Sequence, residues 1–116
     1  MFAVIFEAEP HPSQRQHYLS LAAELKPLLS QIDGFIAIER FQSLTQPEKI
    51  LSLSWWRDEE AIRAWRCQEA HGAAQQAGRD HIFSHYRLRV AAVIRDYGNR
   101  DRAQAPQPKG ATDNGV

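Results

Sequence analysis

Four segments of the chain carry the patterns of β-strands. Residues 2–8, 35–42, 49–56 and 86–94 are rich in aromatic and β-branched side chains, which favour extended structure. The first segment has apolar residues in both alternating sets, whereas the last alternates apolar residues with arginines. Because successive side chains of a strand point to opposite faces of a sheet, the first strand should present apolar groups to both faces.

A helix is predicted between the first two strands. Apolar residues recur there at intervals of three and four, the spacing of one helix face. They are Tyr18, Leu21, Ala22, Leu25, Leu28, Leu29 and Ile32. Ser13 followed by Gln16 predicts a capping box at its start, and Asp33-Gly34 predicts its end. Pro27 should bend or shorten it.

A second helix is predicted after the third strand. Asp58 is a favourable N-cap, and the two glutamates after it lie at the positive end of the helix. Ile62 and Trp65 form its apolar side, and the helical region should end near Gly78. We expect a break between Cys67 and Ala70, because polar residues interrupt the apolar stripe there.

The order strand, helix, strand, strand, helix, strand predicts an α+β fold of the ferredoxin-like, split βαβ kind. In that fold two helices cover one face of a four-stranded antiparallel sheet. Trp55 and Trp56 are neighbours on one strand, so they must project to opposite faces, and the helix-free face should be apolar as well. We therefore expect a homodimer in which the helix-free faces turn toward each other.

The domain should span residues 1–98. From Asn99 onward the sequence has no large apolar residue before Val116, so it cannot offset the entropy lost on ordering. We expect residues 99–116 to form a flexible tail.

Charge and cysteine content limit which binding partners and which cellular compartment are expected for this chain. Fourteen Lys and Arg balance 14 Asp and Glu, so no net field favours nucleic acid or an anionic membrane. No stretch approaches the roughly 20 apolar residues of a membrane span. Cys67 is the single cysteine, which excludes an internal disulfide and favours a cytoplasmic location.

The segment Leu51–Trp65, together with His71, Gly78-Arg79 and the terminal strand to Tyr97-Gly98, resembles the antibiotic biosynthesis monooxygenase superfamily. The resemblance implies a dimeric α+β barrel and a homodimer. It also implies a monooxygenase that oxygenates an aromatic or polycyclic substrate without flavin or nicotinamide. Other members bind and degrade heme, and a non-catalytic dimeric module that binds a small ligand would share the same fold.

His71 is the first candidate for chemistry. As a base it would remove a phenolic or carbon-bound proton, giving an anion that reacts directly with dioxygen. In the heme alternative His71 binds iron and Trp65 presses on the porphyrin, as the resemblance implies. A partly exposed histidine bonded to a backbone carbonyl is the structural alternative. Trp55 or Trp56, with Phe41 and Trp65, would supply the aromatic walls for a flat substrate.

Glu39 and Arg79 are the charged candidates. Glu39 should share a strand face with Phe35 and could line the cavity as an acid or base. An ion pair with Arg87 or Arg89 is the favoured alternative, since buried charges are usually paired. Arg79 could bind an anionic substrate group, although a solvated cation at a helix C-terminus explains it as well.

Metal and nucleotide sites are not expected. His81 and His85 are four residues apart, but no third ligand is close in sequence. No glycine-rich phosphate loop or dinucleotide fingerprint occurs, so we expect no cofactor other than the alternative heme.

Overall fold

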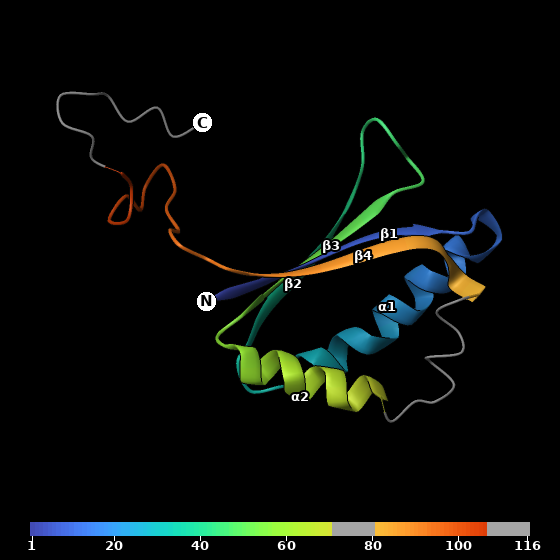
Figure 1. The fold of residues 1–116 in the computed structure, drawn as a ribbon, viewed down its shortest axis with the longest axis horizontal. Helices are drawn as coiled ribbons and strands as arrows, with labels where there is room; N and C mark the ends of the chain where they lie inside the picture. The colour runs from blue at the N-terminus through green and yellow to red at the C-terminus, as the bar shows by residue number, and fades with distance from the viewer. Residues whose placement is uncertain (71–80, 107–116) are drawn as a thin grey trace.

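The computed structural model, which describes residues 1–70 and 81–106, contains one antiparallel sheet with both helices on the same side (Figure 1). In chain order the elements are β1 (Phe2–Pro10), a 3-10 turn η1 (Pro12–Gln14), α1 (Arg15–Leu29), β2 (Phe35–Gln42), β3 (Ile50–Trp56), α2 (Glu59–Ala70) and β4 (Phe83–Ala92). This order confirms the predicted ferredoxin-like fold. None of the described helices has the length and apolar run needed to span a bilayer.

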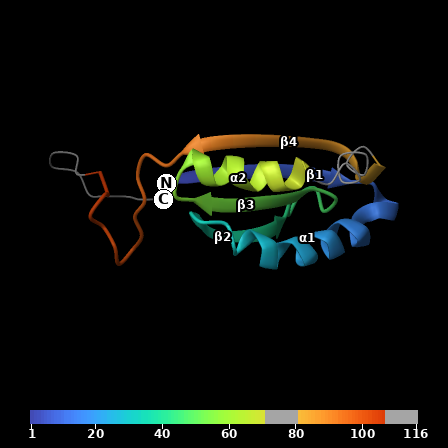
Figure 2. The same cartoon turned by 90° about the horizontal axis from the view of Figure 1, so that it is seen from below.

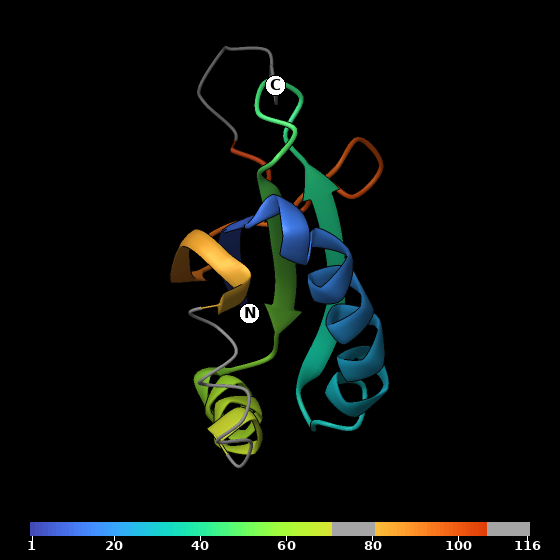
Figure 3. The same cartoon turned by 90° about the vertical axis from the view of Figure 1, so that its right-hand side faces the viewer.

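The strands lie side by side in the order β2-β3-β1-β4. β1 and β3 therefore form the middle of the sheet, and β2 and β4 form its two edges. Figure 2 shows this order, with α1 along β2 and β4 at the edge away from α1. Figure 3 shows α1 beside β2, with α2 set apart from it on the β4 side. The two helices thus do not cover the sheet evenly.

A bulge at the start of β2 changes which side chains share a face. Phe35 and Ala37 lie opposite the consecutive residues Trp56 and Trp55, so one extra residue of β2 is accommodated between them. Phe35 consequently points to the helix side, where its ring meets that of Trp56 edge-on at 5.2 Å between centroids. The expectation that Phe35 shares a face with Glu39 is wrong, because the bulge reverses the alternation.

The start of α1 differs from the predicted capping box. The chain enters α1 through η1, and neither N-cap residue, His11 or Gln14, makes a side-chain capping bond. The side-chain amide of Gln16 donates instead to the Ser20 hydroxyl at 3.5 Å. Pro27 lies inside the helix, which continues to Leu29. The 3-10 turn before α1 sets the backbone geometry at the start of the helix, and a Ser-x-x-Gln pattern does not predict such a turn.

The apolar stripe of α1 is largely confirmed. Tyr18, Ala22 and Leu29 are buried, and Ile32 just after the helix is buried as well. Leu28, by contrast, is exposed.

The start of α2 matches the prediction. The Asp58 carboxylate accepts a hydrogen bond from the backbone N–H of Ala61 at 2.9 Å. Arg57 donates to Asp58 at 2.8 Å and to Asp33 at 3.2 Å. The bond from Arg57, with help from the Ala61 amide, lowers the pKa of Asp58. Gly34 has a φ of 93°, and a Cβ there would lie 2.8 Å from the Cβ of Ala61, so a glycine is required where this loop meets α2.

α2 continues without interruption from Glu59 to Ala70. The predicted break between Cys67 and Ala70 is therefore wrong. The predicted end of the helical region near Gly78 lies outside the described residues.

The segment after β4 makes local contacts. The Gly98 N–H donates to the Asp101 carbonyl at 2.8 Å, and the Arg102 guanidinium lies 5.2 Å from the centre of the Tyr97 ring. Ala105 is buried. Part of the predicted tail, residues 107–116, lies outside the described residues.

Candidate functional site

The helix-covered face of the sheet holds two separate apolar clusters. The first surrounds Trp56, which is 2% exposed, and contains Leu29, Ile32, Ala61 and Ile62, with Trp65 packed against it. The second contains Tyr18, Ile50 and Ile82. Ile50 and Trp56 stand at the two ends of β3, so the clusters occupy opposite ends of this face.

Polar side chains lie between the two clusters. Ser52 and Ser54 are on β3 between Ile50 and Trp56, and both are buried. Ser54 is satisfied, because its hydroxyl accepts a hydrogen bond from the indole N–H of Trp56 at 2.8 Å. Arg40 of β2 lies directly opposite Ser52, and its Nε is buried without a hydrogen-bond partner in the described part of the chain. The middle of this face is therefore polar.

The β4 side of the same face is apolar and incompletely covered. Tyr86, Leu88 and Val90 are 43%, 40% and 41% exposed, and Leu88 lies opposite Phe6 of β1. The ring of Phe6 is 5.7 Å from that of Tyr86 and 5.6 Å from that of Phe83. A flat apolar molecule would find aromatic and aliphatic contacts here.

The helix-free face is apolar along its two middle strands. It carries Ala3 and Ile5 from β1 and Leu51, Leu53 and Trp55 from β3, and the three β3 residues alternate with the buried residues of that strand. Trp55 lies between Ala3 and Ala37, whose small side chains flank the indole. Trp55 and Trp56 project to opposite faces, as predicted.

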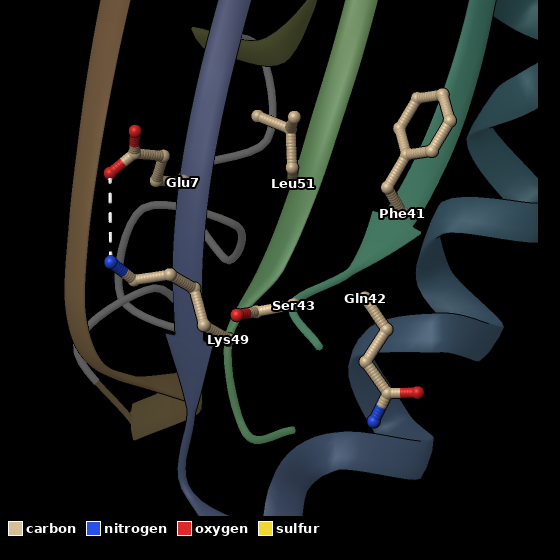
Figure 4. Close-up of a pocket in the computed structure, with 6 residues that line it drawn as sticks. All are labelled: Glu7, Phe41, Gln42, Ser43, Lys49 and Leu51. Atoms are coloured by element: carbon tan, nitrogen blue, oxygen red, sulfur yellow. Dashed lines mark ion pairs between the residues drawn. The ribbon is translucent and has the colours of Figure 1, made fainter. Parts of the chain in front are cut away.

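A hollow of about 250 Å³ lies at one end of the helix-free face (Figure 4). It is lined by Glu7, Phe41, Gln42, Ser43, Lys49 and Leu51. The Glu7 carboxylate lies 3.9 Å from the Lys49 ammonium and 3.3 Å from the Arg89 guanidinium. These three charges link β1 to β4 and to Lys49, the residue just before β3, at this end of the sheet.

The structure divides the aromatic residues proposed from the sequence between the two faces. Trp56 and Trp65 lie on the helix-covered face, where Trp56 is part of the core. Trp55 and Phe41 lie on the helix-free face, which the register of β3 with its neighbours determines. One chain therefore does not bring Phe41 and Trp65 together in a single pocket.

The predicted ion pair of Glu39 with Arg87 or Arg89 is wrong. Glu39 is on edge strand β2 and the two arginines are on edge strand β4, with two strands between them. Arg89 pairs with Glu7 of the adjacent strand instead. Glu7 was missed, although it is the first residue to interrupt the apolar run at the start of β1.

His71 and Arg79 lie outside the described residues, so their proposed roles remain predictions. Among the residues that the structure does describe, no group of three or more His, Cys, Asp or Glu side chains could hold a metal ion. Cys67 is exposed on α2.

The chain belongs to the antibiotic biosynthesis monooxygenase family, whose model matches residues 1–77. The Jasmonate monooxygenase ABM of Pyricularia oryzae is 52% identical over 93 residues, which cover 80% of this chain and 43% of that protein. The chain thus spans less than half the length of this relative.

Solved structures of low sequence identity share the fold. Rv0793 from Mycobacterium tuberculosis superposes with a TM-score of 0.72 at 17% identity, covering 84% of this chain and 98% of that chain. A mutant of MhuD with two manganese protoporphyrin IX molecules per active site superposes with a TM-score of 0.62 at 20% identity, covering 84% of this chain and 99% of that chain. At such identities the likeness shows the fold alone.

Proposed function

We propose that this chain is an oxygenase domain that inserts oxygen from O₂ into a small, largely apolar substrate of the jasmonate kind or into a polycyclic phenol. The observation that carries the proposal is the 52% identity over 93 residues to the jasmonate monooxygenase. The incompletely covered apolar surface of Phe6, Leu88 and Val90 supports it, because a hydrophobic substrate needs such contacts.

The proposed reaction needs neither flavin nor nicotinamide. A base removes a proton from a carbon that a neighbouring carbonyl or phenol has made acidic, and the carbanion adds O₂. The resulting hydroperoxide loses water and leaves a carbonyl. One CH₂ group and one O₂ thus give one C=O group and one H₂O, and the substrate supplies all the electrons. His71 is the proposed base.

A homodimer is part of the proposal. The apolar strip of Leu51, Leu53 and Trp55 on the helix-free face supports it, because such a strip is seldom left in water. More than half of the jasmonate monooxygenase lies outside the matched region. That relative is long enough to carry a second domain of this size on one chain.

Oxygen uptake by the purified chain tests the proposal. Jasmonate and 1,8-dihydroxyanthrone are offered separately, without added flavin, nicotinamide or metal, under ¹⁸O₂. We expect one O₂ consumed per product and one labelled oxygen atom in that product. His71→Ala should slow turnover by about 10²- to 10⁴-fold, the usual contribution of a general base. His17→Ala, which changes an exposed histidine of α1, is the matched control.

Two results would contradict the proposal. Tight binding of both probes without oxygen uptake would favour a non-catalytic ligand-binding module. Product that forms only when a reductant is added would exclude the route in which the substrate supplies all the electrons.

A further inference from the structure

Arg40 is a cation in the polar band of the helix-covered face. The Nε of its guanidinium is buried and has no hydrogen-bond partner in the described part of the chain. Its cross-strand neighbour is Ser52, which is 7% exposed and whose hydroxyl makes no hydrogen bond to another described residue. Two polar side chains therefore stand next to each other with unused hydrogen-bonding groups.

No carboxylate of the described chain neutralises Arg40. Its chain neighbour Glu39 points to the opposite face of the sheet, as does Glu7, which already pairs with Lys49 and Arg89. Within residues 1–70 and 81–106, the recorded ion pairs engage Glu7, Asp33 and Asp58 and leave Arg40 out. Glu24 on α1 and Glu60 on α2 are exposed.

A buried Nε–H that no described residue pairs is unfavourable for the ligand-free protein. Arginine stays protonated in proteins, so it cannot escape the cost of burial by losing its charge. Burying a polar or charged group without a partner costs free energy, and an incoming anion recovers part of that cost. The planar guanidinium fits a carboxylate particularly well, because two N–H groups can donate to its two oxygens.

The surroundings of Arg40 define the shape of such an anion. Arg40, Ser52, Phe6 and Leu88 form one row across the four strands, on the helix-covered face. Neighbouring strands are about 4.8 Å apart, so the Cα atoms at the two ends of the row are separated by roughly 14 Å. The row has a cation and a hydroxyl at one end and an apolar side chain that is 40% exposed at the other. A small amphiphilic acid would match this distribution.

We propose that Arg40, with Ser52 beside it, binds the carboxylate of a small apolar acid whose hydrocarbon part lies along Phe6 and Leu88. The inference rests on the proposed function, and it names the chemical class of the substrate and the residue that selects it. Arg40 is then a binding residue that distinguishes an acid from its neutral ester.

Paired probes test this selection independently of turnover. Jasmonate is compared with methyl jasmonate, and 2-naphthoate with methyl 2-naphthoate, by calorimetry and tryptophan fluorescence. We expect the wild-type chain to bind each acid about 10- to 100-fold more tightly than its ester, the range typical of a hydrogen bond to a charged group. In Arg40→Gln the preference should fall to about one while ester binding changes little. Arg40→Lys should keep part of the preference.

Arg63→Gln is the matched control, because Arg63 is an exposed arginine on α2. It should retain the preference for the acids.

A second measurement separates a binding role from a structural one. Arg40→Met removes the buried Nε–H that no described residue pairs, so the ligand-free Tm should rise by about 4 to 8 °C while acid binding is lost. A residue with a structural role would lower the Tm instead.

The outcomes distinguish this inference from the proposed function. Equal binding of acid and ester by the wild type, no binding of either probe, or unchanged preference in Arg40→Gln would each overturn the role of Arg40. Selective, Arg40-dependent binding without oxygen uptake would leave this inference standing and remove the oxygenase proposal. Oxygen uptake with no discrimination between acid and ester would leave the oxygenase proposal standing and remove the role of Arg40.

Discussion

Adjacent residues of β3 lie in different environments on the two faces of the sheet. Trp56 is enclosed by residues of α1 and α2, and its indole N–H is satisfied by Ser54. Trp55, one residue earlier, lies on the helix-free face between two alanines. The covered face also contains the polar pair Arg40 and Ser52, whereas the middle strands of the free face are apolar over most of their length. One face thus combines a core with candidate binding groups, and the other is suited to association.

The difference in packing between the two faces is tested most strongly by replacing each of the two tryptophans with alanine. Trp56→Ala should lower the free energy of unfolding by about 3–5 kcal/mol, because it removes a fully enclosed ring from the core. Trp55→Ala should cost clearly less in a single chain, since its ring has lost less contact with water. Urea unfolding at low protein concentration measures both values. Equal losses would mean that the two faces are not different in packing.

A charge on the free face should prevent self-association. Trp55→Glu places a carboxylate in the centre of the proposed interface and should weaken dimerisation by about 2–4 kcal/mol, the range of an interface hot spot. Light scattering at micromolar concentration gives the mass. Leu44→Glu is the control, because Leu44 is fully exposed in the loop between β2 and β3 and should leave the dimer intact. A wild-type chain that is monomeric at this concentration would contradict the interface.

The cap of α2 should make the helix-covered face sensitive to acid. The hydrogen bond from Arg57 lowers the pKa of Asp58 in the folded protein, so the ionised carboxylate stabilises the fold. This contribution is fully present above 3.8, the ordinary pKa of an aspartate carboxyl, and is lost as the pH falls through the lower pKa of the folded protein. The urea midpoint of the wild type should therefore fall between pH 4 and pH 2. Asp58→Asn, which can still cap but carries no charge, should show a smaller decrease.

The smallest effect is expected from hemin. Its titration should give a weak, non-saturating spectral change, because the family resemblance implies an asparagine in the first strand of heme-degrading members, and this chain has Phe6 and Glu7 there. Absorbance of the Soret band monitors binding. A sharp band at one equivalent that disappears in His71→Ala would instead support the heme-binding alternative.

Local sequence patterns were sufficient for the order of the elements and for the boundaries of β2 and β3, whereas β1 extends to Pro10 and β4 spans Phe83–Ala92 rather than the predicted 86–94. β2 spans the predicted residues 35–42, and β3 begins one residue after its predicted start. The opposite orientations of Trp55 and Trp56 and the cap at Asp58 were also predictable, because each depends on residues a few positions apart.

The candidate site was less predictable than the fold. The aromatic residues selected from the sequence separate onto two faces, and neither Glu7 nor Arg40 was selected at all. Arg40 gives no signal in the sequence, because a single arginine in a strand is as compatible with a solvated position as with a binding site. That its Nε has no partner among the described residues becomes visible once its cross-strand neighbours are known.

The sequence by itself therefore determined the order of helices and strands, the ferredoxin-like plan and the opposite orientations of Trp55 and Trp56. Tertiary structure decided the strand order, which places Glu39 and Arg89 on opposite edges, and the bulge that turns Phe35 toward Trp56. The physical reason is the separation along the chain of the residues that interact. Periodicity and capping reflect interactions between residues close in the chain, whereas pairing partners and register result from packing between segments that the sequence separates.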